Sequence, residues 1–151
     1  MARRYPDGNG FFLRTPPPSL SGSAPLREMS LDSPRQLRDI RVVMRDLFAA
    51  HCPPGARRYG KADEVVLAVN ELLINALQHG RAPIVFQAHR AESALICDVA
   101  DHQTIAHPLV RPRRPDDISG RGLLLVSSLA CAAGWYQRAS MKHVWAQFSL
   151  D

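Results

Sequence analysis

The segment ELLINALQHG, residues 71–80, is the most informative stretch of this 151-residue chain. It belongs to a predicted helix, 62–79, whose apolar residues cover nearly the whole circumference, as is typical of a mostly buried helix. Glu71 and Asn75 interrupt this apolar surface four residues apart, so they share one face of the helix. Gly80 follows as a suitable C-terminal stop.

The polar pair Glu71 and Asn75 permits two interpretations. A carboxylate among so many apolar side chains is unfavourable unless it is paired or bound to a cation. The pair is either the solvated edge of an ordinary helix, bonded to neighbouring side chains, or a carboxylate and an amide that face a polar ligand. Gln78 and His79 continue this side one turn further on, and His79 either lines a pocket or caps its helix.

The remaining periodicities predict a small α+β domain. Residues 26–32 alternate as a short strand, and Ser33 and Pro34 suit the N-cap and first position of a helix. The element order and the short connections favour a mostly antiparallel sheet covered on one face by about three helices, a two-layer α/β sandwich. Further strands are predicted over 84–89, 94–100, 135–138 and 143–150, and a third helix over 120–133.

The composition limits where this chain acts and how it is organised. It is 46% hydrophobic and 22% charged, as in soluble domains, without an apolar run that would span a bilayer or a secretory signal. We therefore expect a cytoplasmic protein with no membrane contact. Residues 1–25 hold five prolines and three glycines and are predicted to be a disordered tail, with one domain over 26–151. Cys52, Cys97 and Cys131 are far apart and are interpreted as buried free thiols.

The net charge of the chain is +5, and basic residues are concentrated in residues 34–61, which hold seven basic and two acidic residues. Such a stretch indicates a solvated face or an acidic protein partner ahead of nucleic acid, because no DNA-binding motif accompanies it. A small basic DNA-binding protein remains a third hypothesis, and it predicts strongly salt-dependent DNA binding.

Two further segments carry candidate binding residues. Asp101 ends the strand 94–100 on the face that Leu95, Cys97 and Val99 share, whereas Asp98 lies on the opposite face, where we expect it to be exposed to solvent. Residues 120–122, Gly-Arg-Gly, precede a helix. Glycines let a backbone approach an anion at a helix N-terminus, although a simple turn explains the same pattern.

Taken together in chain order, these segments resemble the GHKL, or histidine-kinase-like, ATPase superfamily. Within it they resemble the anti-sigma-factor serine/threonine kinases. ELLINALQHG resembles the N box, Glu-x-x-x-Asn, of that superfamily. The resemblance implies a Bergerat-type ATP-binding fold with Glu71 as the catalytic base and Asn75 as a magnesium ligand. A hard cation with oxygen ligands and a base beside it suit phosphoryl transfer.

The same resemblance implies further nucleotide contacts. Asp101 would accept a hydrogen bond from the adenine amino group, and 102–119 resembles the ATP lid. SGRGLLLVSSLA resembles the second glycine box, and MKHVWAQF resembles the closing strand, with His143 in place of a threonine. The nucleotide-binding residues expected are Asn75, His79, Asp101, Gly120, Arg121, Gly122, Leu123 and Lys142.

The function that the resemblance implies is an ATP- and magnesium-dependent protein serine/threonine kinase in transcription regulation. It would bind a sigma factor, phosphorylate an anti-sigma-factor antagonist and form homodimers, with no direct contact to nucleic acid. Two departures from the family's sequence pattern favour an alternative function. In this alternative the protein is a catalytically weak or inactive protein-binding regulator. Asp101 is followed by His102, Gln103 and Thr104 instead of the glycines of the first glycine box, and His143 replaces the threonine.

Overall fold

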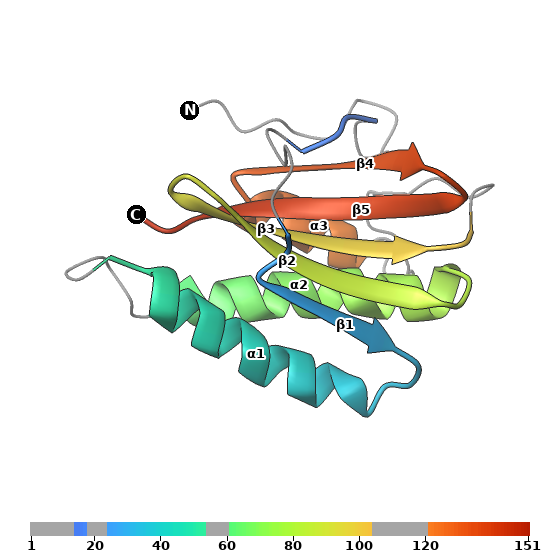
Figure 1. Ribbon diagram of the computed structural model, residues 1–151, viewed down its shortest axis with the longest axis horizontal. Coiled ribbons are helices and arrows are strands. Elements are labelled where there is room, and N and C mark those ends of the chain that lie inside the picture. The colour runs from blue at the N-terminus through green and yellow to red at the C-terminus, as the bar shows by residue number, and fades with distance from the viewer. Residues whose placement is uncertain (1–13, 18–23, 54–60, 104–120) are drawn as a thin grey trace.

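The computed structural model describes residues 14–17, 24–53, 61–103 and 121–151. These residues form a five-stranded sheet with helices on one face, which confirms the predicted α+β two-layer sandwich (Figure 1). None of the described helices is long and apolar enough to cross a membrane. In chain order the elements are β1 (Arg27–Leu31), α1 (Gln36–His51), α2 (Lys61–His79), β2 (Ile84–Ala91), β3 (Ala94–Asp101), α3 (Arg121–Leu129), β4 (Ala132–Arg138) and β5 (Met141–Ser149).

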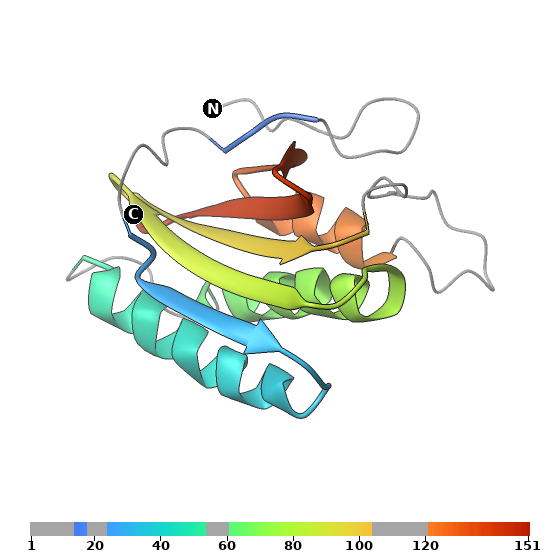
Figure 2. The ribbon, with the colours of Figure 1, turned by 45° about the vertical axis from the view of Figure 1, so that its right-hand side comes forward.

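The sheet has the strand order β1-β2-β3-β5-β4, and all neighbouring strands are antiparallel. The C-terminal hairpin is therefore placed so that β5, the last strand, lies beside β3. In the register of this pair, Asp101 lies opposite Lys142 and Asp98 lies opposite Trp145. Figure 2 shows the curved sheet with the helices below it. The strand order thus brings the end of β3 next to the beginning of β5.

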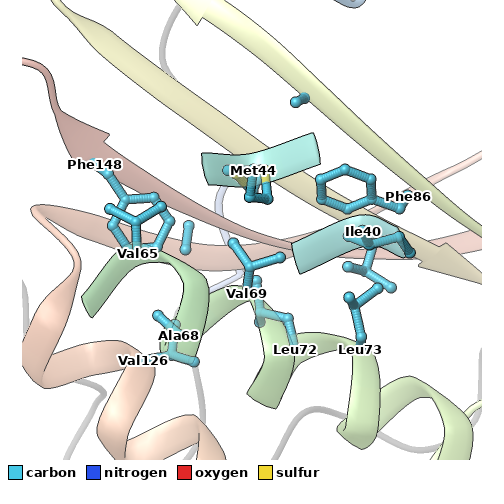
Figure 3. Close-up of a cluster of buried hydrophobic side chains, with 14 of the residues drawn as sticks. Ile40, Met44, Val65, Ala68, Val69, Leu72, Leu73, Phe86, Val126 and Phe148 are labelled. Atoms are coloured by element: carbon cyan, nitrogen blue, oxygen red, sulfur yellow. The ribbon is translucent and has the colours of Figure 1, made fainter. Parts of the chain in front are cut away.

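The core lies between the sheet and the helices. Helix α1 contributes one apolar stripe of residues spaced three or four apart, as expected for a helix with a single buried face. The buried residues of helix α2 lie on one side of the helix, against the core (Figure 3). Leu67 is 45% exposed, so the prediction that α2 is buried around nearly its whole circumference is wrong for the other side. Each fully buried aliphatic or aromatic side chain contributes about 1.5–3 kcal/mol to folding. The least exposed large side chains include Ile40, Met44, Leu72, Leu73, Phe86 and Leu95.

Helix α1 begins two residues later than predicted. Gln36 is its first residue and Arg35 occupies the N-cap position without a side-chain hydrogen bond, so the prediction that Ser33 is the N-cap is wrong. Instead, the side chain of Gln36 folds back over the preceding turn. Its Oε1 accepts hydrogen bonds from the backbone amide of Ser33, at 3.2 Å, and from that of Asp32. The first amides of the helix, those of Gln36 and Leu37, donate instead to the carbonyls of Ser33 and Pro34, each at 3.2 Å.

The third helix is shorter than predicted, and the strand after it begins earlier. Helix α3 ends at Leu129, and β4 begins at Ala132. The backbone amide of Cys131 donates to the carbonyl of Gln147 in β5 at 2.8 Å. The residues that begin β4 have a local pattern that continues that of the helix. They form a strand instead because they pair with β5.

The three cysteines are free thiols, as predicted. Cys52 and Cys97 are buried, but Cys131 is exposed at the start of β4, which contradicts the prediction that all three are buried. Burial raises the pKa of the Cys97 thiol, so this thiol stays protonated and unreactive near neutral pH.

The sheet face away from the helices holds a buried carboxylate. Asp98 is 1% exposed, so the prediction that it is exposed to solvent is wrong. Its Oδ2 accepts a hydrogen bond from the Tyr136 hydroxyl at 2.8 Å, and its Oδ1 lies 2.8 Å from His143 Nδ1. The rings of Tyr136 and His143 stack with their centroids 4.6 Å apart. Burial, followed by the charge of Asp98, raises the pKa of Tyr136, so its hydroxyl remains a donor.

Residues 14–17 run beside the edge strand β4. The amide of Thr15 donates to the carbonyl of Trp135 at 2.8 Å, and the indole Nε1 of Trp145 donates to the carbonyl of Thr15 at 2.7 Å. The guanidinium of Arg14 lies 5.2 Å from the centre of the Trp135 ring, a cation–π distance. This short segment therefore contacts both strands of the C-terminal hairpin.

The sequence predicted a disordered tail over 1–25. Most of this tail, 1–13 and 18–23, lies outside the described residues. The described part, 14–17, is hydrogen-bonded to the sheet, and we expect these bonds to contribute to stability.

Replacing Thr15 with proline is expected to lower the free energy of unfolding by about 1 kcal/mol, because proline cannot donate the backbone hydrogen bond to Trp135. Urea-induced unfolding measures the change. Thr15→Val is the matched control, since it keeps the amide and loses only a weak contact of the hydroxyl to Pro16 at 3.4 Å. Equal stability of the two variants would show that the segment does not hold to the sheet in solution.

Candidate functional site

Glu71 and Asn75 lie four residues apart on helix α2, as predicted. Both side chains are half-buried, whereas Leu72 and Leu73 between them are fully buried. Neither Glu71 nor Asn75 forms a hydrogen bond or ion pair with any residue that the structure describes. Bonding to neighbouring side chains, one of the two interpretations of this pair, is therefore not observed within the described ranges. A half-buried carboxylate and amide without partners retain their full capacity to bind a polar ligand.

The first turn of α3 lies against this pair. A Cβ atom on Gly122 would collide with Oε2 of Glu71 and would lie 3.3 Å from the Cβ of Glu71. A larger residue at position 122 would therefore force the Glu71 carboxylate out of this position. Two segments that are far apart in the sequence, the predicted N box and the predicted glycine turn, therefore meet at Glu71.

The neighbours of Gly122 differ in what they offer a ligand. Leu123 is 1% exposed and belongs to the core, so its side chain packs against the core instead of facing a ligand. Gly120 lies outside the described residues, and so does the side chain of Arg121. His79 is exposed at the last position of α2, and its ring forms no hydrogen bond within the described part of the chain.

Asp101 is a buried carboxylate with a defined orientation. It is 1% exposed at the end of β3. Its Oδ1 accepts hydrogen bonds from the backbone amides of Gln103, at 2.6 Å, and Arg81, at 3.3 Å. Its Oδ2 lies 3.5 Å from Nζ of Lys142, and both side chains of this ion pair are nearly inaccessible to solvent. Lys142 is thus placed by the register of β3 and β5, directly across from Asp101.

Gly80 connects the two groups of residues. Its amide donates to the carbonyl of Ala76 at 2.8 Å, which ends helix α2. A Cβ atom on Gly80 would lie 2.8 Å from both Cγ and Oδ2 of Asp101. Gly80 was predicted as a helix stop, and the structure adds that its lack of a side chain lets the end of α2 pack closely against Asp101. Helix α2 therefore carries Glu71 and Asn75 on one face and presents Gly80 to Asp101 at its end.

Sequence reasoning did not identify the backbone amides of Arg81 and Gln103 as partners of Asp101. The contact to Gln103 has a local signal, because aspartate side chains commonly bond to the amide two residues further on. The contact to Arg81 has none, since it depends on the end of α2 meeting the end of β3.

The oxygen donors at this site fit a magnesium-bound triphosphate better than a metal ion alone. Within the described residues there is no group of three or more His, Cys, Asp or Glu side chains that could hold a metal. Magnesium typically takes one or two protein oxygens and completes its shell with water and phosphate oxygens. The amide oxygen of Asn75, unpartnered and half-buried beside Glu71, suits such a ligand. When bound, the ion would neutralise the charge of the phosphates.

Comparison with known proteins identifies the family. The family model of the histidine kinase-like ATPase domain matches residues 31–148, so the chain belongs to this family. No curated protein matches the chain.

Two solved structures are similar. The structure of the RsbU and RsbW domains of Rv1364c from Mycobacterium tuberculosis matches with a TM-score of 0.58 at 20% identity, which shows a shared fold. The match covers 84% of this chain and 32% of that one, so this chain spans about a third of its length. The histidine kinase AdeS of Acinetobacter baumannii matches with a TM-score of 0.43 at 10% identity, covering 85% and 70% of the two chains.

Proposed function

We propose that this chain is an ATP-binding protein serine/threonine kinase of the anti-sigma-factor type. The observation that carries the proposal is the half-buried pair Glu71 and Asn75, which lies unpartnered within the described residues beside the first turn of α3. Membership of the histidine kinase-like ATPase family supports ATP binding. The shared fold with a chain that contains an RsbW domain supports this type within the family.

The proposed reaction uses few side chains. The hydroxyl oxygen of a serine or threonine attacks the γ-phosphorus of ATP, ADP leaves, and Glu71 takes up the hydroxyl proton. Asn75 would ligate magnesium, and the backbone amides at Gly122 would face the phosphates at the N-terminus of α3. Positioning and charge neutralisation supply most of the catalysis in phosphoryl transfer, so this small set suffices.

The proposed partners are a sigma factor and an antagonist protein that carries the phosphorylated serine or threonine, and the kinase would act as a cytoplasmic homodimer. Helix α1 offers a surface for such a partner. Arg38, Arg41 and Arg45 are exposed on it, and Val42 among them is 54% exposed. A basic surface of this kind would chiefly speed the encounter with an acidic partner and improve selectivity.

A second candidate function is a regulator that keeps the fold and binds proteins but transfers phosphate weakly or not at all. The specific observation in its favour is Asp101, whose carboxylate already has two backbone amides and Lys142 as partners. Titration with ATP and magnesium separates the two functions. Absence of binding would leave the protein-binding regulator.

Replacing Asn75 with alanine is expected to weaken magnesium-dependent ATP binding by about 10-fold or more, because a ligand of the cation is lost. Isothermal titration with and without magnesium measures this effect. The melting temperature should hardly change, since the Asn75 side chain has no hydrogen bond to the described residues.

Asn70→Ala is the matched control, because it removes the same amide one position before Glu71 on the same helix. We expect it to leave the magnesium dependence intact. If Asn70→Ala and Asn75→Ala weakened ATP binding equally, or if neither did, Asn75 would not be the magnesium ligand.

A further inference from the structure

Strand β4 is an edge strand of the sheet, and residues 14–17 lie along its outer side (Figure 1). The backbone groups on the open side of an edge strand are a template for a further strand. Here the chain itself supplies a short one, because Arg14 pairs with Trp135 in a parallel bridge. The edge of β4 at Trp135 is therefore occupied by a segment that is distant in the sequence.

Arg14 and Thr15 are held at this edge by contacts of different kinds. The amide of Thr15 donates to the carbonyl of Trp135 at 2.8 Å, and the carbonyl of Thr15 accepts from the indole Nε1 of Trp145 at 2.7 Å. The guanidinium of Arg14 lies 5.2 Å from the centre of the Trp135 ring and donates to Oε1 of Gln137 at 3.4 Å. The edge thus recognises one basic side chain and the backbone of the residue that follows it.

The groups that bind this segment belong to the folded domain. Trp135 is 4% exposed and packs in the hydrophobic core, and the register of the hairpin sets it opposite Val144. Trp145 is 2% exposed, and in the register of the sheet it lies between Asp98 and Gly134. The positions of both tryptophans are therefore set by the sheet, so we expect them to stay in place when the segment leaves.

The contacts of this segment with β4 are few within the part of the chain that the structure describes. In a parallel ladder every second residue directs its amide toward the neighbouring strand, so the next donor after Thr15 would be residue 17. That residue is Pro17, which has no amide hydrogen, so the ladder cannot continue in this direction. The entropy lost on ordering an extended segment opposes the contacts that do form. The segment can therefore be exchanged for another one.

We propose that the β4 edge is a docking site for an extended segment of a partner protein, and that residues 14–17 are a strap that occupies this site until the partner displaces it. The partner segment runs parallel to β4 and carries an arginine, followed by a residue that supplies a backbone amide and carbonyl. Main-chain hydrogen bonds give affinity in this mode of recognition, and the cation–π contact selects a basic segment. The inference is independent of ATP binding, because it uses no residue of the site at Glu71.

The test is a nuclear magnetic resonance titration of the ¹⁵N-labelled full chain with a peptide of the sequence of residues 11–18, FFLRTPPP. The chain holds two tryptophans, and a spectrum of Trp145→Phe assigns the indole N–H signal of Trp145. Thr15→Pro lacks the amide that binds Trp135, so its own segment competes less. We expect the peptide to bind this variant about 5-fold more tightly than wild type. Binding should move the Trp145 indole signal of the variant toward its wild-type position.

Matched controls separate docking at this edge from unspecific binding. The variant Thr15→Val keeps the amide and should bind the peptide as wild type does. A peptide that carries Thr15→Pro lacks the donor and should bind about 5-fold more weakly, and one that carries Arg14→Ala about 3-fold more weakly. Equal affinity of the three peptides, or equal affinity of wild type and the Thr15→Pro variant for the original peptide, would overturn the proposal.

A second variant covers the case in which Thr15→Pro does not fold, as judged by circular dichroism. Arg14→Ala keeps both backbone hydrogen bonds of Thr15 and loses the cation–π contact, so it should bind the peptide about 3-fold more tightly than wild type. Affinity no higher than that of wild type would contradict the proposal.

Sedimentation of the same proteins without peptide shows which copy of the chain the strap occupies. An oligomeric state that neither Thr15→Pro nor Arg14→Ala changes supports a strap within one chain. A wild-type dimer that these substitutions dissociate would mean that the segment binds β4 of a second copy, and the proposed strap would then be wrong.

Discussion

Replacing Glu71 with glutamine is expected to reduce phosphoryl transfer from ATP to the antagonist protein by about 100-fold or more, the lower limit for loss of a general base. Glutamine has the shape of glutamate but cannot take up a proton. It preserves the close contact with Gly122, which a smaller side chain would abolish. The measurement is the initial rate of labelled phosphate transfer from ATP, with a panel of candidate antagonist proteins as acceptors.

The stability of the Glu71→Gln variant should remain within about 0.5 kcal/mol of wild type, because the carboxylate has no partner among the described residues. Glu64→Gln is the control, since Glu64 is an exposed glutamate in the first turn of the same helix. Transfer at the wild-type rate by Glu71→Gln, with an acceptor that wild type phosphorylates, would rule out Glu71 as the base.

Replacing Asp98 with alanine is expected to lower the free energy of unfolding by about 3 kcal/mol, which is the largest stability effect we predict. The substitution removes the acceptor of two hydrogen bonds and leaves the Tyr136 hydroxyl and His143 Nδ1 without it. Urea-induced unfolding followed by tryptophan fluorescence measures the loss.

Two comparisons test the origin of this loss. Tyr136→Phe removes one of the two hydrogen bonds and should cost about 1–2 kcal/mol. Asp46→Ala removes an exposed carboxylate from α1 and should cost less than about 0.5 kcal/mol. A loss for Asp98→Ala as small as that for Asp46→Ala would mean that the buried hydrogen bonds contribute nothing to stability.

Asp98 also shows that the pattern of a single strand does not predict whether a side chain is buried. Alternation along β3 correctly placed Asp98 on the face away from the helices. The expectation of exposure was wrong because burial depends on neighbouring strands. Tyr136 comes from β4 and His143 from β5, and no periodicity within β3 indicates that they lie next to Asp98.

The polar face of α2 was the part of the site most readily predicted. A helical period places Glu71 and Asn75 on one face whatever surrounds the helix, so their relation follows from local geometry. The glycine turn before α3 was also identified from its local pattern. Its contact with Glu71 was not predicted, because the approach of Gly122 to this side chain depends on how α2 and α3 pack.

The pairing of Asp101 with Lys142 could not be derived from local pattern at all. The sequence predicted Asp101 at a strand end and the closing strand with Lys142, but neither pattern states that these strands are neighbours. The order β3-β5-β4 places the last strand beside β3, and the register then sets Lys142 opposite Asp101.

The sequence by itself determined the elements and the face of each element that is apolar, because helix and strand periods are properties of the local backbone. It therefore determined the two-layer fold and the polar side of α2. Tertiary structure alone decided which polar groups meet. Gly80 against Asp101, the ion pair with Lys142 and the burial of Asp98 all depend on contacts between segments distant in the chain, whose distances are set by packing of the whole core.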